Sequence, residues 1–243
     1  MVALRLLADG LLSVLLAPAC AACGRALDEP TRGAVCASCW DAVTPITSPL
    51  CDRCGDPLPS WRVISLEHAH CPRCRRRSSP VARSRAIGPY QGALREIVHA
   101  LKYDGRRSLA RPLGLRLARA GSDILAGADL VVPVPLHRSR RRARGFNQAA
   151  EIARHLGLPV TDALRRVRAT PSQTDLPAAR RHANMRNAFA MRWRADVGGR
   201  RVVLVDDVST TGATLDACAR ALMDAGALEV RALTAARVVS RPR

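Results

Sequence analysis

Residues 202–214 constrain the fold of this chain more than any other segment. They read Val-Val-Leu-Val-Asp-Asp-Val-Ser-Thr-Thr-Gly-Ala-Thr, and a run rich in Leu and Ala follows them. Four apolar β-formers predict a buried strand, the acid pair marks its carboxyl end, and the hydroxyl-rich turn leads into a helix. Open α/β sheets bind their ligands at the carboxyl ends of parallel strands. The segment therefore predicts a ligand site on an α/β sheet.

The chemistry of this turn suits a phosphorylated sugar. Backbone N–H groups at the start of a helix bind phosphate, and Gly212 allows the backbone to approach it closely. Hydroxyl donors are available on Ser209, Thr210, Thr211 and Thr214. The carboxylates of Asp206 and Asp207, expected at a solvent-facing strand end, would repel a phosphate, so they suit neutral sugar hydroxyls or a divalent cation. The alternative is a plain capped helix with Asp207 or Ser209 as the N-cap.

Composition adds a large positive charge. The 243 residues include 39 basic and 20 acidic side chains, for a formal net charge of +19, and Lys102 is the only lysine. Such a charge favours anionic partners, including nucleic acid and pyrophosphate. Apolar residues make up 48% of the chain and aromatic ones 3%, which predicts an aliphatic core. The length suits one medium α/β domain and a small module, and no apolar run is long enough for a membrane span.

The cysteines predict two metal sites. Eight of the nine form Cys-x-x-Cys pairs, namely Cys20/Cys23, Cys36/Cys39, Cys51/Cys54 and Cys71/Cys74. A two-residue gap suits two thiolates on one tetrahedral zinc ion better than a disulfide. Sequential pairing gives two sites of four cysteines each, with 12 and 16 residues between the pairs, and four thiolates leave no open position for catalysis. Crossed pairing and ligation by His68 or His70 remain alternatives.

The first residues predict a leading helix over 1–17. Leu7, Leu11 and Leu15 fall on one helical face together with Leu4, which indicates an amphipathic helix that packs on its neighbours and ends before Pro18. A lipoprotein signal ending at Cys20 is the alternative, but Asp9 and Gly10 interrupt the apolar stretch. Without an export signal, and with thiols arranged for zinc, we expect a cytoplasmic protein.

The chain divides near residue 80. Residues 1–80 hold the leading helix and the cysteine module, and residues 81–243 form the second domain. Strands are expected at 82–90, 130–135, 201–205 and 230–236, and helices at 92–103, 109–120 and 148–156. Alternating strands and helices predict an α/β fold whose parallel sheet is covered by helices on both faces.

Two further segments have the chemistry of a phosphate site. The strand ending at Pro135 leads into an arginine-rich stretch, residues 138–144, which we expect to form a loop. Guanidinium groups bind phosphate oxygens in pairs, so this loop suits pyrophosphate. Residues 170–187 are polar and basic and lie between two elements, which is typical of a mobile active-site lid.

These features resemble two known families. The 202–214 segment resembles the loop of type I phosphoribosyltransferases that binds 5-phosphoribosyl 1-diphosphate (PRPP). Nearly the whole chain resembles the ComF (ComFC) family of competence proteins, which joins a double zinc ribbon to such a domain. The matching residues are the four Cys-x-x-Cys pairs, Leu101-Lys102-Tyr103, residues 133–137, residues 144–148, Gln173-Thr174 with Arg181 and Asn184, and residues 202–214.

The resemblance implies roles for individual residues. Asp206 and Asp207 would hold the ribose hydroxyls, and Arg138 would belong to the pyrophosphate loop. Gln173 and Arg181 would belong to the flexible catalytic loop. The 5-phosphate would bind Ser209, Thr210, Thr211, Gly212, Ala213 and Thr214.

Two functions follow from this resemblance. The first is a phosphoribosyltransferase that uses PRPP and Mg²⁺ with an acceptor that the sequence does not identify. The second is a non-enzymatic factor that handles single-stranded DNA during DNA uptake, together with other competence proteins. The basic charge favours the second function, and the complete 202–214 motif favours PRPP binding in either case.

Overall fold

The structure, a computed structural model, describes residues 2–58, 69–168 and 187–239. In the N-terminal part the elements are α1 (Val2–Leu16), η1 (Pro30–Arg32), α2 (Ala37–Asp41) and α3 (Pro72–Arg75). The larger part contains β1 (Ser84–Pro89), α4 (Gly92–Tyr103), η3 (Arg107–Leu109), α5 (Ala110–Ala120), α6 (Ser122–Leu125), β2 (Leu130–Pro133), α7 (Arg138–Arg144), α8 (Gln148–Ala153), β3 (Leu164–Arg166), β4 (Phe189–Met191), β5 (Arg201–Ser209), α10 (Ala213–Asp224) and β6 (Glu229–Arg237).

A four-stranded parallel sheet forms the centre of the larger part. Its strand order is β1-β6-β5-β2, and β3 and β4 make a separate antiparallel pair. The central strand β5 pairs with β2 on one side and β6 on the other, so Val202 to Val205 are fully buried. A strand buried on both faces has a continuous apolar sequence, which is the pattern found here.

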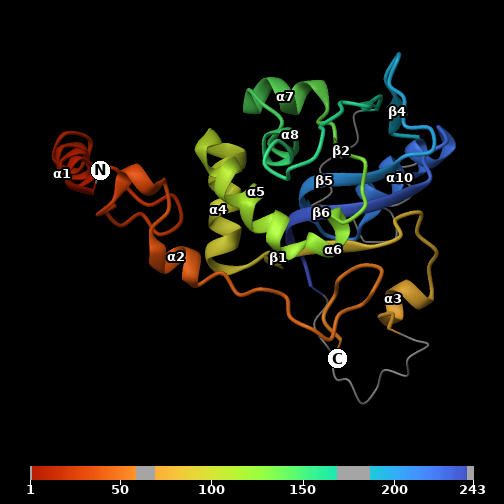
Figure 1. The fold of residues 1–243 in the computed structure, drawn as a ribbon, viewed down its shortest axis with the longest axis horizontal. Coiled ribbons are helices and arrows are strands. Elements are labelled where there is room, and N and C mark those ends of the chain that lie inside the picture. Colours follow the sequence, from red (N-terminus) through yellow and green to blue (C-terminus); the bar gives the residue numbers. More distant parts are fainter. Residues whose placement is uncertain (1, 59–68, 169–186, 240–243) are drawn as a thin grey trace.

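Helices cover both faces of this sheet, as predicted (Figure 1). On one face, α4, α5 and α8 supply buried residues such as Ile97, Leu113 and Ile152. On the other face, α10 packs Leu215, Cys218 and Leu222 against the sheet. The amphipathic helix predicted for 92–103 coincides with α4. The expected α/β architecture is confirmed.

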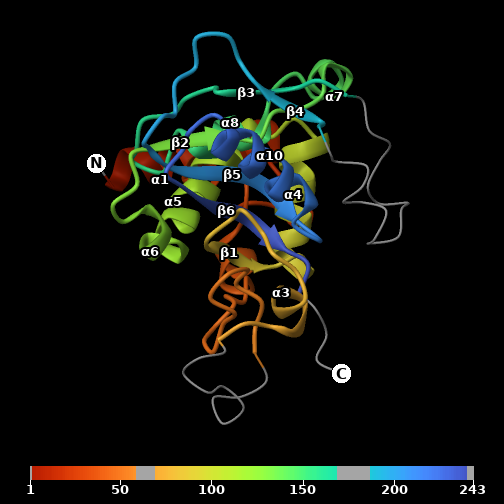
Figure 2. The same ribbon diagram turned by 90° about the vertical axis from the view of Figure 1, so that its right-hand side faces the viewer.

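The two cysteine groups lie on opposite faces of the sheet. Ribbon 1 (residues 18–43) packs on the α4 face, where Cys39 and Leu27 join the core and the Arg116 guanidinium lies 3.7 Å from the centre of the Trp40 indole ring. Ribbon 2 (residues 49–58 and 69–75) lies on the α10 face, where Asp56 and Arg237 form a buried ion pair of 2.6 Å. Figure 2 shows the orange chain of ribbon 2 next to β1, at the edge of the sheet.

The leading helix packs differently from the prediction. Most of its described leucines face solvent, with Leu7 73% exposed and Leu11 and Leu15 similarly open. The buried residue is Asp9, whose carboxylate accepts a hydrogen bond of 2.8 Å from the Thr31 N–H. The helix is therefore attached to ribbon 1 through polar groups, and the predicted apolar packing is wrong. No helix among the described residues is long and apolar enough to cross a membrane.

Candidate ligand site and metal centres

The acid pair lies inside β5 rather than after it. The predicted strand ended at residue 205, but β5 continues to Ser209 because β6 keeps pairing with it as far as Arg237. Successive side chains of a strand point to opposite faces. Asp207 accordingly meets Lys102 of α4, whereas Asp206 lies on the α10 face near Cys218 and Arg166.

Two cations hold Asp207. Lys102 Nζ lies 2.9 Å from Oδ1, and an Arg144 guanidinium nitrogen lies 3.8 Å from Oδ2. The side chains of Lys102 and Asp207 are each only 12% exposed. The expectation of a solvent-facing acid pair is therefore wrong for Asp207, because α4 and the end of α7 cover it.

The two cations are themselves anchored by aromatic and amide groups. Lys102 Nζ lies 5.9 Å from the centre of the Tyr90 ring. Arg144 donates to the Gln148 amide oxygen at 3.1 Å and to the Tyr103 hydroxyl at 3.4 Å. The motifs around residues 101–103 and 144–148, far apart in sequence, thus meet at one carboxylate.

Asp206 sits in a different environment. Loss of hydration and the neighbouring carboxylate of Asp207 raise the pKa of Asp206 to about 7, although its own carboxylate accepts from the Asp207 N–H at 2.9 Å. A carboxyl with a pKa near neutral changes charge under physiological conditions. Asp206 is therefore a group that can change charge near neutral pH, on the face of the sheet opposite Asp207.

The turn after β5 forms a small hollow at the start of α10. Its lining residues are Asp206, Val208, Ser209, Thr210, Gly212, Ala213, Thr214 and Leu215. The Thr211 hydroxyl accepts from the Ala213 N–H at 3.4 Å, and Gly212 has a left-handed backbone with φ of +78°. A Cβ on Gly212 would meet nothing within 4 Å. Glycine is therefore favoured here by its left-handed backbone conformation.

The arginine-rich segment is a helix and not the predicted loop. His137 Nδ1 accepts from the Ser139 N–H at the start of α7, and Gly145 ends the helix with φ of +75°. Arginine is a good helix former, which explains why this run with capping residues at both ends is helical. Arg138 is exposed on its first turn. The motif at residues 144–148 also caps α8, because the Asn147 amide oxygen accepts from the Ala149 N–H.

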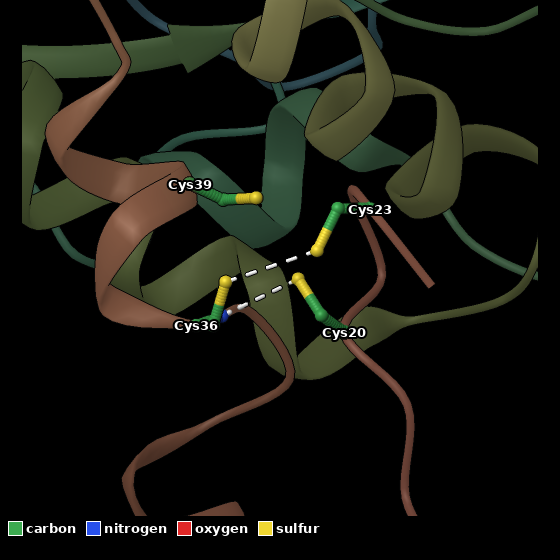
Figure 3. Close-up of side chains that lie close together, drawn as sticks. All are labelled: Cys20, Cys23, Cys36 and Cys39. Atoms are coloured by element: carbon green, nitrogen blue, oxygen red, sulfur yellow. Dashed lines mark hydrogen bonds between the residues drawn. The ribbon is translucent and has the colours of Figure 1, made fainter. Parts of the chain in front are cut away.

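The eight paired cysteines form two groups of four, in the sequential pairing predicted. Cys20, Cys23, Cys36 and Cys39 make the first group (Figure 3), and Cys51, Cys54, Cys71 and Cys74 make the second. Within each group the sulfur atoms lie within 4.8 Å of one another, with 3.9 Å between Cys23 and Cys36 and 3.6 Å between Cys54 and Cys71. Four sulfurs around one tetrahedral zinc lie about 3.8 Å apart, so both groups fit a structural zinc ion.

Known proteins with similar sequences share both halves of the chain. Residues 11–75 match the model of a double zinc ribbon domain, and residues 142–242 match that of a phosphoribosyl transferase domain. DNA utilization protein YhgH of Escherichia coli K12 is 33% identical, over 81% of this chain and 87% of that protein. Competence protein F of Haemophilus influenzae is 30% identical, over 85% of this chain and 91% of that protein.

The chain belongs to the ComF family. Among solved structures, a Bacillus subtilis glutamine PRPP amidotransferase is 28% identical over 53% of the ComF chain and 26% of its own, with a TM-score of 0.36.

Part of the predicted ComF site lies outside the described residues. Gln173 and Arg181 fall in residues 169–186, as does most of the predicted catalytic loop, and His68 falls in residues 59–68. The 202–214 motif by itself gives no indication that Lys102 and Arg144 are partners of Asp207. The available signals were the single lysine in a chain that otherwise uses arginine, and the presence of residues 101–103 and 144–148 among the segments that resemble the ComF family.

Proposed function

We propose that this ComF protein binds PRPP with Mg²⁺ at the carboxyl edge of its sheet and transfers the phosphoribosyl group to an acceptor. The main support is the convergence of an acid pair, a hydroxyl-rich turn and two cations at the end of β5. Under this proposal, Asp206 and Asp207 accept from the ribose hydroxyls, and Ser209 to Thr214 hold the 5-phosphate. Arg138 lies on α7, the next element after the neighbouring strand β2.

The side chains would act mainly by electrostatic stabilisation. In the reaction the bond between ribose C1 and a pyrophosphate oxygen breaks, a bond from C1 to the acceptor forms, and the acceptor loses a proton. Mg²⁺ would neutralise charge on the leaving pyrophosphate. Under this proposal, Lys102 and Arg144 leave Asp207 for a pyrophosphate oxygen once the ribose hydroxyls occupy that carboxylate, and they then stabilise the charge that develops.

Other parts of the proposal concern organisation. We propose residues 1–80 and 81–243 as the two units, with two structural zinc ions in the first. Eight thiolates need a reducing compartment, which supports a cytoplasmic location.

Titration calorimetry with PRPP and Mg²⁺ tests this function, and its pH dependence tests the site. Asp206 must be ionised to accept from a hydroxyl, and its raised pKa of about 7 leaves it largely protonated at lower pH. We expect affinity to increase about 10-fold between pH 6 and pH 8 and then to level off. PRPP itself also ionises, so Asp206→Asn serves as the control: its affinity should lack the change with pH that comes from Asp206. Absence of binding at every pH would contradict the proposal.

The second candidate function is binding of single-stranded DNA. Its support is the exposed arginine surface of α7, including Arg138, Arg141 and Arg142, together with relatives named for DNA utilization and competence. Guanidinium groups on a helix surface bind phosphates without reading sequence.

Salt dependence tests the DNA hypothesis. Each phosphate contact on a single strand contributes a slope of about −0.7 to log K against log salt. Measured by fluorescence anisotropy with oligothymidylate, Arg141→Gln with Arg142→Gln should make the slope about 1.4 less negative. The matched control is Arg111→Gln with Arg119→Gln, on the exposed side of α5. Equal changes in both pairs would show that only net charge matters, and α7 would lose its assigned role.

A further inference from the structure

A second pocket adjoins the turn between β5 and α10, on the side of ribbon 2. It shares Ser209, Gly212 and Leu215 with the hollow at the acid pair, but its other wall comes from ribbon 2 and the residues that follow it, up to Ser84. The cavity measures about 60 Å³. One water needs about 10–15 Å³ measured in this way, so the pocket has room for a small polyatomic ion.

Two buried polar groups face this pocket without a partner. Ser209 is 4% exposed and Arg237 is 3% exposed, and both line the cavity. Within the described residues, Ser209 Oγ and Arg237 Nη2 have no hydrogen-bond partner, although Arg237 Nε donates to Asp56. A buried group left unsatisfied costs stability. Because a guanidinium nitrogen can only donate, the missing partner is an acceptor.

Most of the other charged groups around the pocket already have hydrogen-bond or ion-pair partners. Arg53 donates to the carbonyls of Cys74 and Arg77, and Arg73 pairs with Asp56 and donates to the Thr210 carbonyl. The Arg77 side chain is exposed at the rim.

The fixed charges of the two walls nearly cancel. Asp216 lines the pocket, and Asp56 pairs with Arg73 and Arg237 beside it. Together with the double negative charge that a zinc ion and four thiolates would carry, these acids balance the four guanidinium groups. Binding here therefore depends on directed hydrogen bonds and not on excess charge.

We propose that this pocket is a second site for a phosphate-type oxyanion, held by Ser209 Oγ, Arg237 Nη2 and Arg77. An oxyanion supplies several acceptors at once and satisfies both buried groups. The pocket shares Ser209 with the turn of the proposed PRPP site, but it adds Arg237 and Arg77, which that site does not use.

The test uses inorganic phosphate as the probe. Calorimetric titration of the zinc-loaded wild-type chain with inorganic phosphate, in saturating PRPP and Mg²⁺, should still give one phosphate per chain. Arg77→Gln and Ser209→Ala should each weaken it about 10-fold, whereas Arg76→Gln, an equal loss of charge beside the pocket, should not. Ser209→Ala should also leave thermal stability unchanged or raise it, because it removes an unpartnered buried hydroxyl.

A competition experiment with oligothymidylate identifies the source of the phosphate. If phosphate displaces oligothymidylate in proportion to its occupancy, a DNA phosphodiester uses the pocket. If the two bind independently, the ligand is a free phosphate or pyrophosphate, and both outcomes support the site. The proposal is overturned if PRPP abolishes phosphate binding to the wild-type chain, if Arg76→Gln and Arg77→Gln act equally, or if phosphate does not bind at all, which would leave a cavity filled by water.

Discussion

Replacing Cys51 by serine should remove one zinc ion per chain. It should also disturb the turn between β5 and α10, which the corresponding change in ribbon 1 should leave intact. Cys51 is fully buried in the second group of four sulfurs. Binding of zinc contributes about 10–16 kcal/mol in small zinc modules, and most of their folding energy comes from it. Ribbon 2 should therefore unfold when the site loses a ligand.

The disturbance follows from the contacts of ribbon 2 with the larger part of the chain. Asp56 pairs with Arg237 at 2.6 Å, and Arg73 donates to the carbonyl of Thr210 in the turn. Unfolding of ribbon 2 removes the carboxylate partner of Arg237 and the Arg73 contact with the turn, and it opens the buried end of β6 to water. We expect a lower unfolding temperature and, if PRPP binds as proposed, an affinity reduced at least 10-fold.

Two variants control this result. Cys23→Ser removes a ligand of the first zinc site, on the other face of the sheet, and should lower the zinc content equally while leaving PRPP affinity nearly unchanged. Cys218→Ala changes the one cysteine outside both groups and should retain two zinc ions. Metal analysis, thermal unfolding and calorimetry give the three readouts. A full zinc content in Cys51→Ser, or equal loss of affinity in Cys51→Ser and Cys23→Ser, would contradict the prediction.

The combined change Asp206→Asn and Asp207→Asn should abolish most PRPP binding. An amide keeps the shape of each carboxylate but replaces a charged acceptor with a neutral one. Charge-assisted hydrogen bonds are about twice as strong as neutral ones, so each change should cost about 1–3 kcal/mol, or about 10- to 100-fold in affinity. The pair should cost more than either change alone, without strict additivity because the two acids are neighbours.

Stability distinguishes a binding defect from a folding defect. The raised pKa of Asp206 means that its carboxyl stabilises the folded state fully below the unfolded value and loses this contribution as pH rises through about 7. Asp206→Asn should therefore be at least as stable as wild type at pH 8. Asp207→Asn leaves Lys102 and Arg144 without their carboxylate and should be less stable. Asp224→Asn, exposed at the end of α10, is the control for charge. Unchanged affinity in the double variant would reduce the motif to a capped turn.

The sequence predicted the features that depend on local pattern. The apolar run of β5, the period of α4 and the cysteine spacing each describe contacts within one element or one short module, and the structure confirms them. The strand continues to Ser209 because β6 lies beside it. Local propensity does not contain that information.

The sequence did not predict features that depend on contacts between segments far apart in the chain. The pairing of Lys102 and Arg144 with Asp207 requires α4, α7 and β5 to meet, and no spacing in the chain indicates it. The α1 leucines have a helical period, but Asp9 forms the contact with ribbon 1. The period identified the helix correctly, whereas its attached face is set by hydrogen bonds to residues far along the chain, from Thr31 N–H to Asp9 and from the Ser13 hydroxyl to the Leu27 carbonyl.

The placement of the two ribbons on opposite faces also protects the sheet from other chains. Strand β1 is the outer strand on its side, and an unpaired edge of this kind can recruit a strand from another molecule. A Cβ on Gly88 of β1 would lie 2.5 Å from the Thr44 carbonyl oxygen on one side, while Arg85 donates to the Asp52 carbonyl on the other. The N-terminal chain thus covers the outer strand β1. A fragment beginning at residue 81 would lose this cover and would be prone to aggregation, whatever its ability to bind a ligand.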